Sequence, residues 1–162
     1  EAQQLFHRAR QQRRLAAHYR RHYLDNEPTI PLFDGAAQLL SDLDDAGFLL
    51  AVATGKTRAG LDRAIAKNGL AGRFHATRCA DEGLPKPHPD MLLALMERLA
   101  ADPRDTLMIG DTTHDLDLAR NAGAHGLAVA YGAHKPLAFA DHAPLAVVQS
   151  IAELHAWLDR HA

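Results

Sequence analysis

From residue 34 onward the chain alternates between short continuous apolar runs and stripes of apolar residues at helical spacing. FLLAVAT (48–54) is a continuous run, which is typical of a strand buried on both faces. Strands that alternate with helices predict an α/β fold, a doubly wound parallel sheet covered on both faces. The further strands are expected at 74–79, 106–109, 126–131 and 145–148, and the helices at 34–46, 58–68, 88–100, 113–121, 136–141 and from 151 onward.

Three residues are expected to mark helix ends. Asp34 is a candidate N-cap for the helix that follows it, and Gly47 is expected to end that helix. Gly69 is expected to stop the helix at 58–68. Before this regular region, residues 2–24 are predicted to form one helix, and the two prolines of 25–32 indicate a connection between modules.

Composition narrows the class of protein. The chain has 162 residues, about one domain, and a formal net charge of −2, which gives no argument for a nucleic-acid or membrane partner. The single cysteine, Cys79, excludes an internal disulfide and suits a reducing cytosol. The longest apolar run, 48–53, is too short to cross a bilayer. We therefore expect a soluble, cytoplasmic protein.

Polar residues follow the strands at the edge where parallel α/β sheets bind ligands. Thr54 ends the run at 48–54 and is followed by Gly55. A hydroxyl and backbone N–H groups at a helix entrance suit a phosphate group. The alternative is that Thr54 only caps the next helix.

Lys86 lies between Pro85 and Pro87, just before a predicted helix. The prolines restrict the backbone, which suits a side chain that must point in one direction. The alternative is an ordinary solvated lysine.

The segment MIGDTTHD (108–115) carries two carboxylates. Gly110 permits a tight turn, Asp111 follows the strand, and Asp115 lies four residues later near the start of a helix. Such oxygen ligands suit Mg²⁺, which commonly takes one or two carboxylates together with water and substrate phosphate. The alternative is that both are helix N-terminal acids favoured by the macrodipole.

Taken in order, these motifs resemble the haloacid dehalogenase superfamily of phosphohydrolases, most closely the phosphoglycolate phosphatase branch, which has a helical cap. The resemblance implies that residues 1–28 are the C-terminal part of the cap and that 29–162 form the α/β core. It further implies that Thr54 and Gly55 bind phosphate, that Lys86 stabilises charge on the phosphate and the nucleophile, and that the metal residues for Mg²⁺ are Asp111 and Asp115.

The same resemblance implies a reaction and a substrate class. An aspartate attacks the phosphorus of a small phosphorylated metabolite, and water hydrolyses the resulting aspartyl-phosphate. A second aspartate two residues later acts as acid and base. Alternatives within the superfamily are a phosphosugar mutase and a dehalogenase, which attacks carbon and needs no metal. The non-enzymatic alternative is a phosphate-binding pseudoenzyme without catalytic activity.

The chain departs from the superfamily pattern at the nucleophile. The DxD motif at the end of the central strand is missing, and LFDG (32–35) supplies one aspartate followed by a predicted helix. We therefore expect an inactive C-terminal fragment. Without that strand, the two neighbouring strands would each lose a partner, at about 1–3 kcal/mol for each unpaired buried group.

Overall fold

The structure is a computed structural model that describes residues 31–161. The chain divides into two units, Glu1–Leu32 and Phe33–Ala162, and all the elements named below belong to the second. The helix expected at 2–24 and the module boundary at 28/29 lie outside the described residues and stay predictions.

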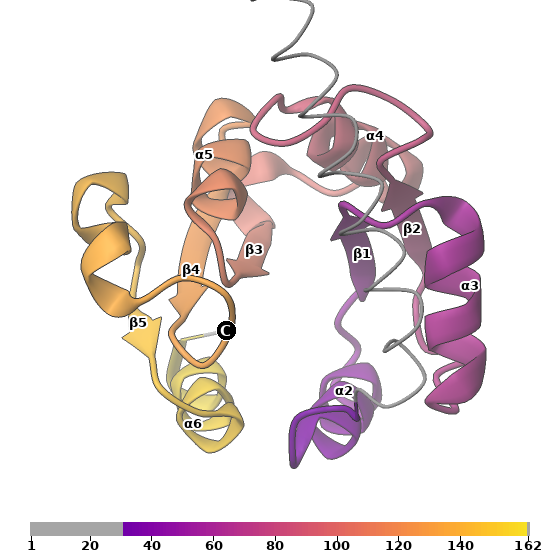
Figure 1. Ribbon diagram of the computed structural model, residues 1–162. Coiled ribbons are helices and arrows are strands. Elements are labelled where there is room, and N and C mark those ends of the chain that lie inside the picture. The colour runs from indigo at the N-terminus through magenta and orange to yellow at the C-terminus, as the bar shows by residue number, and fades with distance from the viewer. Residues whose placement is uncertain (1–30, 162) are drawn as a thin grey trace, which may run out of the picture. The chain divides into compact units, whose positions relative to one another are not determined.

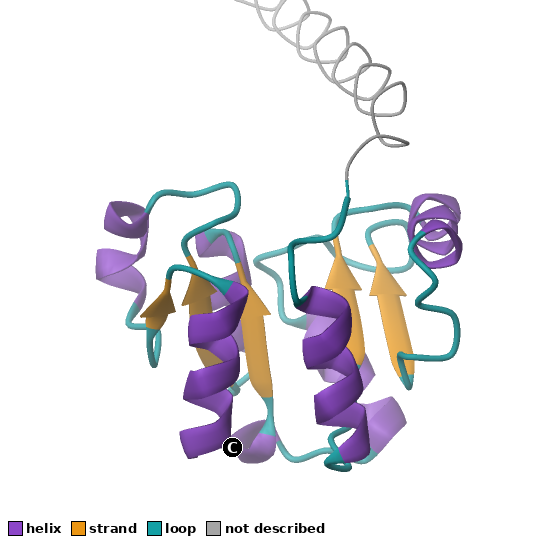
Figure 2. Ribbon diagram, turned by 90° about the horizontal axis from the view of Figure 1, so that it is seen from below, coloured by secondary structure: helices purple, strands orange, loops and turns teal. Residues whose placement is uncertain are grey.

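In the described part of the chain, five strands form two parallel sheets. One sheet pairs β1 (Ala51–Thr54) with β2 (Ala76–Cys79). The other has the order β3 (Leu107–Gly110), β4 (His125–Val129) and β5 (Val147–Val148). The strands of both sheets point in the same direction (Figure 2). The predicted parallel α/β fold is therefore confirmed.

Helices cover both faces of these sheets. Helices α4 (Asp90–Leu99) and α5 (Thr113–Asn121) lie on one face, and α2 (Ala36–Asp45) and α6 (Ile151–His161) lie together on the other (Figures 1 and 2). Helix α3 (Arg58–Lys67) packs against β2. The short 3₁₀ helices are η2 (Pro103–Asp105) and η3 (Pro136–His142).

Apolar side chains fill the space between the sheets and each helical layer. The cluster beneath α2 and α6 is Leu39, Leu127, Val129, Val148, Leu154 and Leu158. The cluster beneath α4 and α5 is Leu92, Met96, Leu118, Ala119 and Ala122. Because successive strand residues point to opposite faces, alternate residues of β4 serve different layers.

The helix ends agree with the sequence in two of three cases. Gly47 and Gly69 follow their helices with φ of 87° and 65°, left-handed values that favour glycine. The prediction that Asp34 caps α2 is wrong. The residue at the N-cap is Gly35, with φ of 82° and no side-chain hydrogen bond to the helix.

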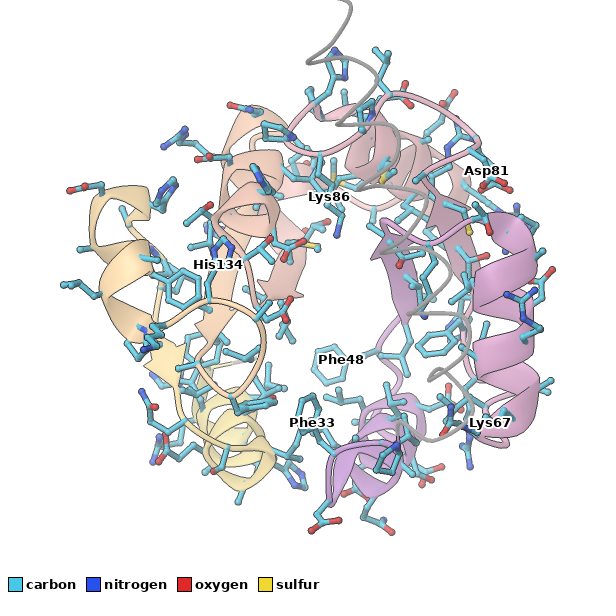
Figure 3. All side chains as sticks on the ribbon, viewed as in Figure 1. Phe33, Phe48, Lys67, Asp81, Lys86 and His134 are labelled. Atoms are coloured by element: carbon cyan, nitrogen blue, oxygen red, sulfur yellow. The ribbon has the colours of Figure 1, made fainter. Side chains whose placement is uncertain are left out.

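Strand β1 is shorter and more exposed than its sequence predicts. The expectation of a strand over 48–54 buried on both faces is wrong, because only Ala51–Thr54 is strand and none of its residues is fully buried. Phe48 remains 40% exposed and, like Phe33 at 56%, points into the region between the two sheets (Figure 3). The physical reason is that, among residues 31–161, β1 has a neighbouring strand on one side only.

The unpaired edges of β1 and β3 can be assigned from the hydrogen-bond alternation. His75 N donates to Leu50 O, so residues 50, 52 and 54 direct their backbone groups toward β2. Ala51 and Ala53 therefore direct theirs away from it. By the same alternation, His125 N donates to Thr106 O, and residues 107 and 109 direct their groups away from β4. Within the described residues, no pairing joins the two sheets.

Candidate active site

Lys86 is held between two segments that are distant in the sequence. Its Nζ donates to Asp115 Oδ1 at 2.6 Å and to the Ala53 carbonyl at 2.8 Å. The Lys86 side chain is 17% exposed and that of Asp115 is 6% exposed. The alternative of a solvated lysine is therefore wrong. Lys86 connects the open edge of β1 to the start of α5 (Figure 3).

Asp115 is fixed by the start of its own helix. Thr112 is the N-cap of α5 and forms a capping box with Asp115. Asp115 Oδ2 accepts from the Thr112 backbone N at 3.0 Å and from its hydroxyl at 2.7 Å. Since Oδ1 accepts from Lys86, both carboxylate oxygens have protein donors. The helix-acid alternative therefore describes Asp115 correctly, but it leaves out the bond to Lys86.

Gly110 leaves the space that Asp115 occupies. A Cβ built on Gly110 would lie 2.2 Å from Asp115 Cβ, far inside van der Waals contact. The glycine was expected from the sequence to permit a turn, and in the structure it also permits this close approach.

Asp111 is held by the loop that follows β4. Ala133 N donates to Asp111 Oδ2 at 2.8 Å, and His134 N donates to the Asp111 carbonyl at 3.0 Å. A Cβ on Gly132 would lie 2.2 Å from Asp111 Cβ, so this position also requires glycine. The sequence interpretation missed this loop, although the rule that ligands bind at strand ends could have directed attention to it.

The charge of Asp111 also acts on the neighbouring Tyr131. Burial and then the negative charge of Asp111 raise the pKa of the Tyr131 phenol. The ring of Tyr131 contacts that of Phe33 edge to face, with centroids 4.9 Å apart. A neutral Tyr131 therefore lines this end of β4 at physiological pH.

Thr54 fixes the turn after β1 and does not cap α3. Its hydroxyl accepts from Lys56 N at 3.1 Å, whereas the N-cap of α3 is Thr57, which accepts from Gly60 N. The alternative role of Thr54 as a helix cap is therefore wrong. A Cβ on Gly55 would meet nothing within 4 Å, so the backbone of this turn borders open space.

Asp111 and Asp115 differ in how well their carboxylates are placed to bind Mg²⁺. Asp111 Oδ1 has no hydrogen-bond partner among the described residues, so it can be offered to a cation. Both oxygens of Asp115 are engaged, and its place in the metal site stays a prediction. Within residues 31–161 no group of three or more His, Cys, Asp or Glu could hold a metal alone. The donor set therefore fits an ion that takes one carboxylate and completes its shell with water and substrate oxygens.

A parallel α/β core with polar residues near the carboxyl ends of its strands, of which Lys86 and Asp115 are in direct contact, defines the general class of this protein. The chain belongs to the haloacid dehalogenase-like hydrolase family, whose model matches residues 1–129. Over the part that the structure describes, no helix is both long and apolar enough to cross a membrane.

Individual relatives agree with this family. The chain is 36% identical over 143 residues to the "Probable phosphatase IndB" of Dickeya dadantii, covering 88% of this chain and 62% of that protein. It is 32% identical over 125 residues to a phosphoglycolate phosphatase of Vibrio vulnificus, covering 76% and 54%. A crystal structure of a predicted phosphatase from Clostridium acetobutylicum is 30% identical, with a TM-score of 0.73, and covers 79% of this chain and 60% of that one. The chain thus spans only part of the length of these relatives.

Proposed function

We propose that the protein containing this chain is a Mg²⁺-dependent phosphomonoester hydrolase of the phosphoglycolate phosphatase type, acting on a small phosphorylated metabolite in the cytoplasm. The observation that carries the proposal is the placement of Lys86 Nζ between the Ala53 carbonyl and Asp115 Oδ1. It puts a cation beside the end of β1, where Thr54 lies, and beside the start of α5. The phosphatase names of the relatives support the same conclusion.

Each residue has a role that follows from its contacts. The Thr54 hydroxyl and the backbone N–H groups of its turn would donate to phosphoryl oxygens, with Gly55 leaving room for their approach. Lys86 would balance the negative charge on phosphate and nucleophile, while Asp115 holds its ammonium in place. Asp111 would bind Mg²⁺ through Oδ1, and the ion would offset charge on the phosphate.

The nucleophile in this proposal comes from a strand outside the described elements. The chain's two D-x-D sequences do not end strands, because Asp42 and Asp44 lie in α2 and Asp115 and Asp117 lie in α5. The unpaired backbone N–H and C=O groups at the edges of β1 and β3 are available to pair with an additional strand. A parallel DxD strand placed there would end beside Lys86.

The proposed reaction has two steps. The first aspartate attacks phosphorus, the ester P–O bond breaks, and the second aspartate protonates the leaving alkoxide. That second aspartate then takes a proton from water, which attacks the aspartyl-phosphate and releases inorganic phosphate. Because both aspartates lie outside this chain, we expect the 162-residue chain alone to be inactive.

The proposal is tested by phosphate release from a panel of phosphoglycolate, sugar phosphates and p-nitrophenyl phosphate. The full gene product and the 162-residue chain are compared with and without Mg²⁺. We expect turnover only from the full product with Mg²⁺, and its loss in Lys86→Ala. Phosphate binding without turnover in the full product would instead support the pseudoenzyme. Turnover of 2-haloacids without metal would support the dehalogenase, and isomerisation of sugar phosphates the mutase.

A further inference from the structure

The segment that carries Lys86 has no regular secondary structure. Residues 80–89 connect β2 to α4 without helix or strand. A lysine on such a loop keeps its ammonium at one place only if the loop itself is held. The structure shows that side chains of α3, α4 and α5 hold the loop, and that the side chain from α3 holds its start.

Arg58, the first residue of α3, binds the start of this loop through a two-pronged ion pair. Its Nε donates to Glu82 Oε1 at 2.9 Å and its Nη2 to Glu82 Oε2 at 2.9 Å. Its Nη1 donates to Thr77 Oγ1 at 2.8 Å, and its backbone N donates to Asp81 at 2.9 Å. A planar guanidinium satisfied on several sides in this way fixes orientation as well as distance.

Glu82 is tied back to the sheet as well as to Arg58. Its Oε2 also accepts from Cys79 N, at 2.8 Å. The Arg58 hydrogen bonds, followed by the Cys79 N–H, lower the pKa of Glu82 to about 2. The carboxylate is therefore charged throughout the physiological range.

Further hydrogen bonds hold the loop on either side of Lys86. Leu84 N donates to Asp90 Oδ2 at 3.2 Å, and a Cβ on Gly83 would lie 2.1 Å from the same oxygen. Beyond Lys86, the Asn121 side chain donates to the Pro87 carbonyl at 3.0 Å. The loop is thus held on both sides of Lys86, and the Arg58–Glu82 pair holds its N-terminal side.

We propose that Arg58 and Glu82 are a positioning pair that fixes the 80–89 loop and thereby places the Lys86 ammonium for phosphate transfer. Only the catalytic part of this proposal rests on the proposed function; the restraint of the loop does not. Neither side chain contacts the Lys86 ammonium; both act through the loop. Their side chains are 35% and 29% exposed, so the pair is accessible to substitution without opening the core.

The test measures the accessibility and reactivity of the Lys86 amine, separately from turnover. The full gene product is treated with a water-soluble amine-acylating reagent, and modification of Lys86 is quantified by peptide mass spectrometry against exposed Lys135 in the same sample. Arg58→Gln removes the guanidinium and its positive charge. Arg58→Lys keeps the positive charge without the two-pronged hydrogen bonding, and Glu82→Gln removes the negative charge of the carboxylate that Arg58 binds. Arg104→Gln is the matched control, since Arg104 of η2 makes a comparable two-pronged pair with Asp102, the N-cap of that helix.

We expect Arg58→Gln and Glu82→Gln to accelerate acylation of Lys86 about tenfold relative to Lys135, Arg58→Lys to do so partly, and Arg104→Gln to have no effect. We also expect kcat per folded molecule to fall about tenfold or more while KM changes by less than about threefold. If acylation of Lys86 is unchanged in both Arg58→Gln and Glu82→Gln, the positioning pair is refuted. If acylation rises but kcat per folded molecule does not fall, the pair is structural and the proposal is also refuted. A wild-type protein without phosphatase activity would refute the proposed function, and the acylation rates would still decide whether the pair holds the loop.

Discussion

The ammonium of Lys86 lies 2.6 Å from Oδ1 of Asp115, and both side chains are largely removed from solvent. The other oxygen of Asp115 accepts two hydrogen bonds from Thr112, which hold the carboxylate in this orientation. This pair joins the loop after β2 to the first turn of α5. Its removal should therefore affect stability as well as catalysis.

Replacing Lys86 with Met should leave the buried Asp115 carboxylate without its cation. We expect the free energy of unfolding of the full gene product to fall by about 3 kcal/mol, measured by urea denaturation. Adding Asp115→Asn should cost less than the sum of the single substitutions. The control is Lys135→Met at an exposed position, which should change stability by less than about 0.5 kcal/mol. A loss of less than about 1 kcal/mol in Lys86→Met would contradict the buried pair.

Gly132→Ala should displace Asp111, because the added methyl group would lie 2.2 Å from Asp111 Cβ. We expect the Mg²⁺ affinity of the full gene product, measured by calorimetry, to weaken about tenfold or more. Gly60→Ala is the control, since its added methyl group would meet atoms no closer than 3.4 Å. Unchanged Mg²⁺ affinity in Gly132→Ala would show that Asp111 does not bind the ion.

The Arg58–Glu82 pair predicts a specific acid dependence of stability. The pKa of Glu82 is lowered from 4.5 to about 2, so the folded protein favours the charged form. The stabilisation is fully present above pH 4.5 and is lost as the pH falls through about 2. The difference in urea midpoint between wild type and Glu82→Gln should therefore be largest at neutral pH and shrink below pH 4.5. A difference that is independent of pH would contradict the charged pair.

Cys79 should report unfolding near β2. The residue is fully buried, and burial raises the pKa of its thiol, while the positive charge of Arg58 acts in the opposite direction. We expect the native thiol to react with an aromatic disulfide reagent at least about 10³-fold more slowly than the unfolded chain, because reaction requires opening of the core. A native rate within about tenfold of the unfolded rate would show that β2 opens readily.

The elements of the core could be predicted because each has its own local pattern. The sequence predicts helices at 58–68, ended by Gly69, and at 113–121, and α3 and α5 agree with these bounds within one residue. The burial of β1 could not be predicted in this way. The burial of β1 depends on whether another strand pairs with its second edge, and the residue pattern of 48–54 carries no information about that pairing.

The strand-end residues of the site could likewise be predicted, whereas their supports could not. Asp111 directly follows an apolar strand, and Lys86 lies between two prolines just before a helix, so both stand in recognisable short motifs. The support of Asp111 comes through the Ala133 backbone N–H, a group that nearly every residue possesses. The Arg58–Glu82 contact joins residues 24 positions apart, and only the fold brings them together.

The most direct measurement is acid-quench trapping of a phosphoenzyme in the full gene product during turnover of a labelled phosphomonoester with Mg²⁺. We expect a covalent phosphate that hydroxylamine removes, as an aspartyl-phosphate requires, and that is lost when unlabelled substrate is added. Lys86→Ala should abolish its formation. Turnover with no trapped phosphate, or a phosphate stable to hydroxylamine, would contradict an aspartate nucleophile beside Lys86.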